Sequence, residues 1–323
     1  MTSHLPANVR QAYPCWKCAA LRAYYYGSLP YRLIYRRWAA RQGRVPVVVL
    51  FYHRVADDGA NGWTTHPATF ARQIEWLRAH CDLVSLAEAQ RLIGEGHRGR
   101  VSVCITFDDG YSENCQHALP LLIRDRIPCT YFVTLKNILD GTPFAHDVAC
   151  GYPLTPNSLE QIRALAAAGI EIGSHTYSHV DLGAVQDRQQ LRLEVLRPRD
   201  ELQRLLGRPV RYFALPFGLR RNMSRAVFDL ARQGGYAGVC SAYGAYNLVG
   251  EDPFHIRRVH ADDDLIRLKN WVTLDPRKLW LQWQSPEIPP AEPTAVEPAE
   301  AAGVRREEWP TMRDGAVRGG WNG

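Results

Sequence analysis

The stretch VSVCITFDDG, residues 101–110, is an apolar run that ends in two adjacent carboxylates and a glycine. Its first seven residues are rich in β-branched side chains, which is typical of a buried strand. Two neighbouring aspartates repel each other, and a protein interior has little reason to hold both. Asp108 and Asp109 therefore suggest a positive partner at the end of this strand. An ordinary turn with a capping Asp is the alternative interpretation.

Short apolar runs alternate with longer amphipathic ones between about residue 46 and residue 275. The predicted strands are 47–53, 101–107, 129–135, 170–175 and 210–217, with two more near 236–241 and 255–260. The predicted helices are 67–80, 112–126, 157–169, 187–206 and 223–235. This α/β alternation favours parallel pairing. About seven such units favour a distorted (β/α) barrel over an open doubly wound sheet.

The composition divides the 323 residues into three parts. Residues 1–45 form a basic, aromatic extension without acidic side chains, and residues 46–284 hold the predicted barrel. Residues 285–323 are rich in Pro and Glu, and we expect a disordered tail there because few apolar side chains are available for a core. The extension suits a membrane surface or an anionic polymer, although a solvated helix packed on the domain explains it as well.

Targeting and partner signals are sparse. The sequence shows no signal peptide, so we expect the chain to be cytoplasmic, or peripheral at the cytoplasmic face of the membrane through its basic N-terminus. The first predicted strand is not followed by a glycine-rich phosphate loop, which argues against nucleotide binding. We also expect no nucleic-acid partner, because no basic groove motif is evident.

Polar side chains stand at the ends of several predicted strands, where the functional groups of a barrel collect. They are Asp108 and Asp109, His175 and His179, His53, His260 and the segment LPFG at 215–218. Two imidazoles and a carboxylate are a common ligand set for a catalytic divalent metal, so Asp109, His175 and His179 are the predicted ligands. Zinc fits them well, and cobalt, nickel, manganese or iron are alternatives. The His-x-x-x-His spacing allows both rings to reach one ion if the segment turns like a helix.

The segments TFDDG (106–110), SHTYSH (174–179) and FALPFG (213–218), in this order, resemble the polysaccharide deacetylase family. This family is also called the NodB-homology domain or carbohydrate esterase family 4. LFYHRV at 50–55 resembles the start of its members that are associated with exopolysaccharides. The resemblance covers roughly residues 45–262. It implies a distorted (β/α) barrel and a metal-dependent hydrolase that removes acetyl groups from N-acetylated sugars.

The resemblance also implies roles for single residues. By motif position, Asp108 would be the general base beside the three metal ligands. The backbone N–H of Phe217 and the metal would stabilise the oxyanion. His260 would protonate the leaving amine. The alternative is that His260 is only a residue at the end of a strand. His53 would line the pocket or cap a turn.

The sequence departs from the family pattern. The family's Asp-Trp motif between the third and fifth motifs is not evident. The third motif of the family often begins with an arginine that orients the catalytic aspartate, and this chain has Ala214 there. Arg54, Arg257 and Arg258 are the candidates to take over that task, and the sequence does not choose among them.

The predicted function is therefore removal of N-acetyl groups from an N-acetylated polysaccharide or oligosaccharide, by a water that the metal activates and Asp108 deprotonates. The first alternative is a related enzyme that acts on a lipid-linked sugar or another non-peptide amide. The second is a metal-binding or glycan-binding relative with impaired catalysis, for which Ala214 would be a sign.

Overall fold

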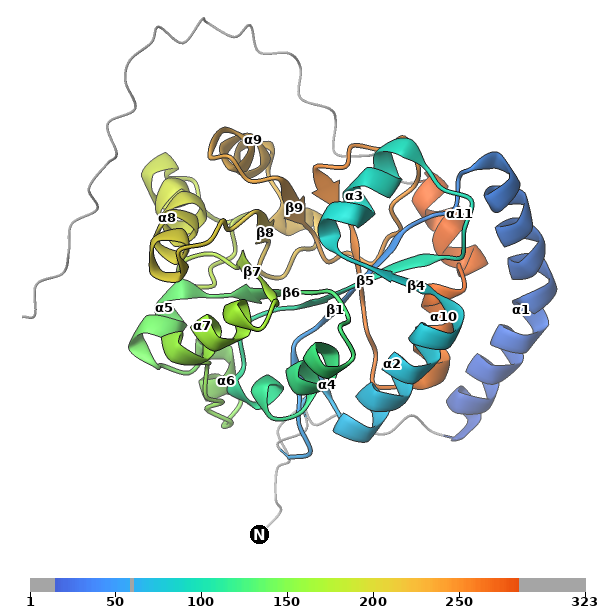
Figure 1. The fold of residues 1–323 in the computed structure, drawn as a ribbon, viewed down its shortest axis with the longest axis horizontal. Helices are drawn as coiled ribbons and strands as arrows, with labels where there is room; N and C mark the ends of the chain where they lie inside the picture. Colours follow the sequence, from blue (N-terminus) through green and yellow to red (C-terminus); the bar gives the residue numbers. More distant parts are fainter. Residues whose placement is uncertain (1–14, 59–60, 285–323) are drawn as a thin grey trace, which may run out of the picture. The chain divides into compact units, whose positions relative to one another are not determined.

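Parallel strands form the centre of the structure, a computed structural model that describes residues 15–58 and 61–284 (Figure 1). The strands pair in the order β10, β9, β8, β7, β6, β5, β1, β11, and all these pairs are parallel. Their bounds are β1 Val48–Tyr52, β5 Ser102–Phe107, β6 Cys129–Val133, β7 Glu171–Ser174, β8 Tyr212–Ala214, β9 Gly238–Cys240, β10 His255–Ile256 and β11 Arg258–His260. Strand β4 (Asp82–Val84) pairs with the first half of β5, and β2 (Arg54–Val55) pairs with β3 (Thr64–Thr65). The predicted tail, 285–323, lies outside the described residues.

Strands β10 and β11 close the ring. They are two parts of one stretch, residues 255–260, which Arg257 divides. β10 pairs with β9, whereas β11 pairs with β1 in a register that sets Phe51 beside His260. One stretch of chain therefore contacts both edges of the sheet and leaves it nearly closed. Strands β1 and β5 to β9 together with this stretch make seven among the described residues, which confirms the predicted distorted (β/α) barrel.

The strands are buried on both faces, as parallel strands covered by helices must be. Successive residues of β1 belong to two different apolar clusters. Val49 packs with Cys104 and Phe132 of neighbouring strands in the smaller cluster, and Leu50 belongs to the larger one, which includes residues of the surrounding helices. The period-two alternation of a strand thus separates the inside of the barrel from its helix-covered outside.

Helix α3 (Leu86–Glu95) lies across the end of the barrel where the strands begin. Its apolar residues pack on the smaller cluster. Gln90 of this helix donates hydrogen bonds to the carbonyls of Ala237 and Pro253. Ala237 directly precedes β9, and Pro253 lies two residues before β10. The sequence pattern did not predict this helix. Its position leaves the opposite end, where the strands finish, available for a site.

The helix predictions agree with the structure in most cases. The other helices are α1 Cys15–Gln42, α2 Pro67–His80, α4 Ala118–Arg124, α5 Leu135–Asp140, α6 Ala145–Ala149, α7 Leu159–Ala167, α8 Arg188–Leu206, α9 Arg225–Gln233, α10 Leu265–Val272 and α11 Pro276–Gln284. The prediction of one helix over 112–126 is wrong. A 3₁₀ turn at Ser112–Cys115 precedes α4, because Pro120 has no N–H and fits only the first turn of a helix.

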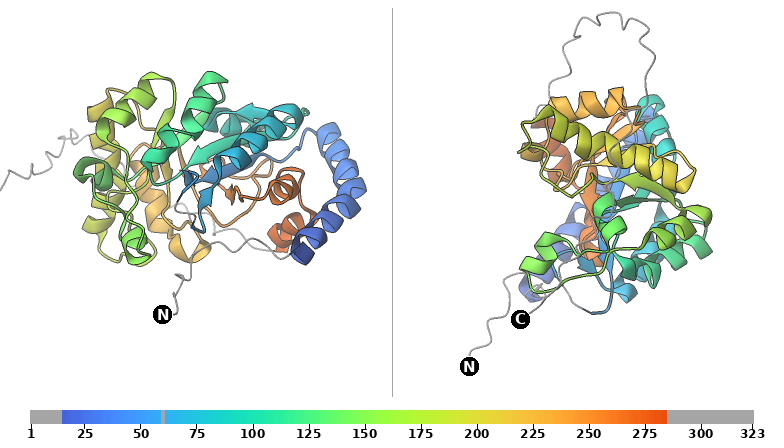
Figure 2. Two further views of the ribbon diagram at one scale, coloured as in Figure 1. Left: turned by 90° about the horizontal axis from the view of Figure 1, so that it is seen from below. Right: turned by 90° about the vertical axis from the view of Figure 1, so that its left-hand side faces the viewer.

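The basic, aromatic extension contains α1, which packs beside α10 and α11 (Figure 2). The Arg32 guanidinium is buried and donates hydrogen bonds to the Asn270 carbonyl and side chain and to Thr273. The Tyr24 hydroxyl donates to Asp275 at 2.6 Å. None of the helices within residues 15–58 and 61–284 has the length and apolar character to cross a membrane.

Candidate active site

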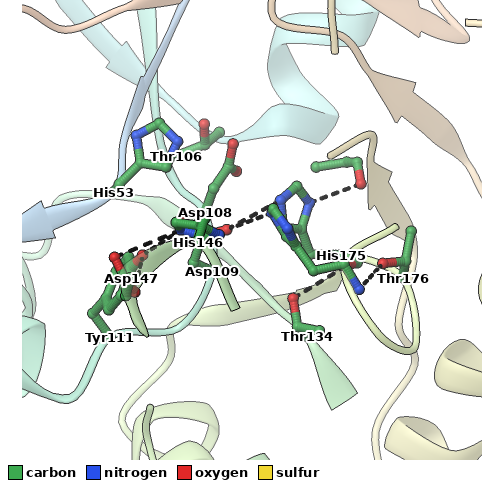
Figure 3. A network of polar contacts seen from close by, with 12 residues as sticks. His53, Thr106, Asp108, Asp109, Tyr111, Thr134, His146, Asp147, His175 and Thr176 are labelled. Atoms are coloured by element: carbon green, nitrogen blue, oxygen red, sulfur yellow. Dashed lines mark hydrogen bonds and ion pairs between the residues drawn. The ribbon is translucent and has the colours of Figure 1, made fainter. Parts of the chain in front are cut away.

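Asp108 and Asp109 follow β5 directly, and their carboxylates contact different partners. Asp108 contacts Arg258, whereas Asp109 faces His175 (Figure 3). The Asp108 N–H donates to the Tyr52 carbonyl at 2.9 Å, so Asp108 still belongs to the ladder with β1. Asp109 has a φ of +72°, a left-handed conformation that is costly for a residue other than glycine. Gly110 follows with a φ of +90°, and a Cβ there would lie 3.3 Å from the Val133 side chain. The chain therefore turns sharply at the end of the strand.

His175 and His179 lie in a loop after β7 and not in a helix, so the helix-like turn that would let both rings reach one ion is absent there. Thr176 and His179 have φ values of +67° and +60°, which an α-helix does not contain. The His179 N–H donates to the Thr176 hydroxyl oxygen at 2.9 Å, which fixes the turn. The loop nevertheless brings the two imidazole centroids to 5.1 Å from each other.

The predicted metal ligands converge on one point. The Nε2 atoms of His175 and His179 lie 3.3 Å and 3.2 Å from the same oxygen, Oδ1 of Asp109. That oxygen is buried and has no hydrogen-bond partner of suitable geometry. The three ligand atoms lie within 4.8 Å of one another. An orphaned carboxylate oxygen facing two imidazole nitrogens fits a divalent ion, and the donor set suits zinc.

The tautomer of His175 agrees with this fit. Its Nδ1 lies 2.8 Å from the carbonyl oxygen of Ala214, which accepts only from a protonated nitrogen. The Nε2 lone pair of the neutral ring is then directed toward Asp109. Metal-binding histidines commonly use such a second hydrogen bond to fix the ring. Ala214 thus serves the site through its backbone.

The charges of the cluster shift the pKa values of its members. Burial alone would raise the pKa of the Asp109 carboxyl, but the facing His175 and His179 imidazoles hold that pKa well below its usual range. Burial lowers the pKa of His175, but Asp108 and Asp109 outweigh it and raise that pKa above its usual value. The site therefore keeps Asp109 ionised and attracts positive charge.

Arg258 is the arginine that contacts Asp108. Its Nη1 and Nη2 donate to the two carboxylate oxygens at 2.6 Å and 2.9 Å, and both side chains are buried. Burial would raise the pKa of Asp108, but the charge of Arg258, together with His175, holds that pKa below its usual range. Arg54 pairs with Glu113 instead, and Arg257 pairs with Glu251. Of the three candidate arginines, Arg258 is the one that donates hydrogen bonds to both carboxylate oxygens of Asp108.

Phe217 follows β8 in an unusual backbone conformation. Its φ is +62°, and the Gly218 N–H donates to the Pro216 carbonyl across it. Its ring is half-exposed and meets the His179 ring at a centroid distance of 5.4 Å. Among the described residues, none accepts a hydrogen bond from the Phe217 N–H. The Phe217 N–H is therefore unpaired within the described part of the chain.

His53 and His260 stand side by side, with ring centroids 5.7 Å apart. The Nδ1 of His53 is buried without a hydrogen-bond partner. Burial lowers the pKa of His53, and the charges of Asp109 and Asp108 oppose this shift. His260 pairs with Phe51 in the barrel register and contacts the Phe51 ring. The two imidazoles thus form one wall of the site.

The sequence analysis did not find a second cluster of polar side chains, which lies beside His179. The Tyr111 hydroxyl donates to Asp147 at 3.0 Å and lies 3.2 Å from Nε2 of His146 (Figure 3). The His146 ring lies 5.4 Å from the His179 ring. Burial raises the pKa of Asp147 to about 7, although the Tyr111 hydrogen bond opposes this shift. These residues lie on or near the five-residue helix α6, which is too short to leave a periodic pattern.

Glu194 of α8 was missed as well. Its carboxylate accepts hydrogen bonds from the N–H groups of Tyr177 and Ser178 and from the Ser178 hydroxyl. It thereby holds the loop between the two ligand histidines. The sequence does contain a signal: Glu194 occupies the apolar stripe of α8, three residues after Leu191 and four before Pro198.

Backbone strain is concentrated at this end of the barrel. Six described residues other than glycine have a positive φ, and four of them belong to the cluster: Asp109, Thr176, His179 and Phe217. Such conformations persist only where the surrounding structure holds them, and they are typical of functional sites.

Comparison with known proteins agrees with this geometry. Residues 95–239, which contain both aspartates and both ligand histidines, match the family described as polysaccharide deacetylase. The chain is similar to the polysaccharide deacetylase family over this region. It is 28% identical over 155 residues to YxkH of Bacillus subtilis (strain 168), a protein that its name assigns provisionally to this family; the match covers 47% of the chain and 50% of YxkH. It is also 36% identical over 85 residues to the chitooligosaccharide deacetylase of Bradyrhizobium sp. (strain ANU 289), with 26% of the chain and 31% of that protein covered.

The matches thus span at most half the length of these curated relatives of the deacetylase family. Among solved structures, IcaB from Ammonifex degensii is similar with a TM-score of 0.58 and 28% identity, over 71% of this chain and 97% of that one. The Streptococcus pyogenes deacetylase PplD has a TM-score of 0.58 and 19% identity, over 75% of this chain and 99% of its own, which supports the fold alone.

Proposed function

We propose that this chain is a metal-dependent hydrolase that removes N-acetyl groups from an N-acetylated polysaccharide or oligosaccharide. One observation carries the proposal: two imidazoles converge on the orphaned Oδ1 of Asp109, and the adjacent Asp108 is held as an ionised carboxylate by Arg258. The match of residues 95–239 to the polysaccharide deacetylase family supports the reaction class.

Asp109, His175 and His179 would hold the divalent ion, for which zinc is the first choice. Such an ion supplies a Lewis acid that polarises the amide carbonyl and lowers the pKa of a water molecule. Glu194 would keep the ligand loop in place, and the Ala214 carbonyl would keep His175 in the binding tautomer.

Asp108 is the general base in this proposal. Its lowered pKa keeps it ionised at neutral pH, so it can accept a proton from the attacking water. The bidentate contact with Arg258 fixes the carboxylate plane, and each oxygen retains a lone pair for the water. Arg258 thereby takes over the task that the family pattern gives to an arginine at the position of Ala214. This argues against the reading of an impaired relative.

The remaining groups serve the later part of the reaction. The available Phe217 N–H would stabilise the charge that develops on the carbonyl oxygen. The wall formed by His53 and His260 would supply the proton that the leaving nitrogen needs, and His260 is the residue that we assign to this role. Breaking the C–N bond then yields acetate and a free amine on the sugar.

A lipid-linked sugar is the second candidate substrate. The specific observation in its favour is the exposed aromatic and basic surface of α1. Comparing acetate release from lipid-linked and soluble N-acetylated sugars distinguishes the two candidates.

The test of the proposed function is acetate release from N-acetylglucosamine oligomers with added zinc or cobalt. Asp108→Asn should lower the rate by about 10² to 10⁴, the range for loss of a general base, while elemental analysis finds the metal content unchanged. His179→Ala should lower the metal content as well. Unchanged activity of Asp108→Asn would remove this residue from the mechanism, and no release from any acetylated glycan would sink the proposal.

A further inference from the structure

The outer face of α1 is an exposed aromatic surface that the proposed reaction does not use. We define this outer face as Trp16, Tyr26, Tyr31, Ile34, Arg37, Trp38 and Arg41, all of which are exposed. Ile34 is 68% exposed and Trp38 is 50% exposed, which is unusual for apolar side chains of this size. Tyr31, Ile34, Trp38 and Arg41 follow one another at intervals of three and four residues, so they share one side of the helix.

The opposite side of α1 anchors it to the domain. Tyr25, Arg32 and Ala39 are buried, and they are spaced at intervals of seven residues. Arg32 binds Asn270 and Thr273 of the α10 region, as described above. The outer face is therefore held in a fixed orientation and points away from the packed side (Figures 1 and 2).

All charged side chains between Met1 and Ala56 are basic. No Asp or Glu occurs between Met1 and Ala56, whereas Arg22, Arg37 and Arg41 are exposed on α1. The aromatic rings lie among these cations: Tyr31 stacks on Tyr35 at 6.3 Å, and Tyr35 contacts Trp38 at 5.7 Å. Trp and Tyr prefer the headgroup region of a bilayer, and arginine prefers anionic lipid headgroups.

The neighbouring helix α11 extends the exposed apolar area. The ring of Tyr24 on α1 lies 3.9 Å from the Arg277 guanidinium at the start of α11, which ties the two helices together. Trp280 and Trp283 of α11 are 57% and 88% exposed. Two packed helices thus both present large aromatic side chains to solvent.

We propose that the outer face of α1 docks the protein on the surface of an anionic phospholipid bilayer. The aromatic rings and Ile34 enter the headgroup and upper acyl region, and the arginines pair with lipid phosphates. The helix lies in the plane of the membrane and does not cross it. This surface goes beyond the proposed deacetylation and would keep the enzyme at a membrane.

A second copy of the chain is a poorer occupant for this face. A symmetric contact would bring the same patch of arginines together from both partners, and like charges oppose that contact. A neutral glycan would gain nothing from the positive charges. An anionic bilayer satisfies both the apolar and the basic side chains, so we assign the surface to it.

The experiment is flotation of the full chain with vesicles of phosphatidylcholine alone and of phosphatidylcholine mixed with phosphatidylglycerol. The wild type should float with the mixed vesicles and hardly with the neutral ones. Each basic side chain near an anionic surface contributes about fivefold in affinity, so Ile34→Glu/Arg37→Glu should reduce binding at least tenfold. Raising the salt from about 0.1 M to about 1 M shortens the Debye length from about 10 Å to about 3 Å and should release the protein.

The matched control is Leu193→Glu/Arg188→Glu. Both residues are exposed on α8, and the double substitution changes the net charge by the same amount. This control should bind vesicles like the wild type. Equal binding by both double variants, or no preference of the wild type for anionic vesicles, would overturn the proposal. So would a change of oligomeric state in Ile34→Glu/Arg37→Glu without vesicle binding by the wild type, because the face would then be a contact between copies.

The same variants separate this proposal from the proposed function. Acetate release from soluble oligomers should be equal in the wild type and Ile34→Glu/Arg37→Glu, because the outer face contributes no residue to the site. Loss of vesicle binding with full soluble activity supports docking by α1 alone. Vesicle binding by a chain that releases no acetate would leave the docking surface intact and refute the reaction.

Discussion

Arg258 has none of its side chain exposed, and it donates a hydrogen bond to each oxygen of the buried Asp108 carboxylate. Arg258→Met would leave that carboxylate without its partner in the interior. Loss of one member of a buried pair costs about 3 to 5 kcal/mol, so urea unfolding should show a decrease of this size in the free energy of unfolding. Adding Asp108→Asn to Arg258→Met should restore part of it, because no buried charge remains. A double variant as unstable as Arg258→Met would contradict this account.

The sequence singled out the two aspartates and the two histidines, because each pair stands in a short motif, and the structure brings Asp109 together with both histidines. It could not select Arg258 from the three candidate arginines. That choice depends on the pairing of β11 with β1 and on the closure of the ring, which bring Arg258 to Asp108, 150 positions away in the sequence. The contact between Tyr111 and Asp147 was not predictable either, since it depends on how a loop folds over the site.

Asp147 predicts a stability change with pH. Burial raises its folded-state pKa to about 7, so the folded state binds this proton more tightly than the unfolded state does. Its contribution to stability is therefore largest below about pH 4 and is lost as the pH rises to about 7. Asp147→Asn cannot ionise. The free energy of unfolding of the variant relative to the wild type should rise by about 1 to 2 kcal/mol over this range, allowing for solvent screening. A difference that does not vary with pH would refute the shifted pKa.

Helix α8 contacts the loop of the proposed metal ligands through one carboxylate. Because Glu194 accepts three hydrogen bonds from the loop between the ligand histidines, Glu194→Gln replaces one accepting oxygen by a donor. We expect metal affinity to fall about 10- to 100-fold, as for other groups that orient ligands, in equilibrium dialysis against zinc. Asp200→Asn, on the same helix, with a side chain that is 54% exposed and pairs with Arg199, is the matched control and should bind zinc like the wild type. Equal affinities of both variants would show that Glu194 has only a structural role.

Elements with strong local signals were predicted best. Helix α2 occupies the predicted residues 67–80, and α7 begins after Ser158, whose hydroxyl and Gln161 form a capping box. The loop of His175 and His179 was misread because the four-residue spacing also suits a helix, whereas two left-handed residues produce the same approach of the rings. Helices α5 and α6 escaped because 6 and 5 residues give too little periodicity.

The barrel as a whole assigns different tasks to its two ends. Helix α3 covers the end where the strands begin, and the strained residues and the metal cluster occupy the end where they finish. Stability and chemistry are thus separated in space, as in other barrels. Helix α1 has two different faces. One face completes the packing of α10, and the other remains exposed and is the surface that we propose for membrane docking.

This division of α1 predicts opposite outcomes for substitutions on its two faces. Arg32 is buried and its guanidinium bonds to Asn270, Thr273 and Ser28. Arg32→Met leaves buried acceptors unpaired, so we expect the free energy of unfolding to fall by about 2 to 4 kcal/mol. Ile34→Glu/Arg37→Glu changes only exposed side chains and should alter it by no more than about 0.5 kcal/mol. Thermal and urea unfolding of the full chain measure both. A large loss in the outer-face variant would mean that this face is packed against the protein, and α1 would then have no free surface to offer a membrane.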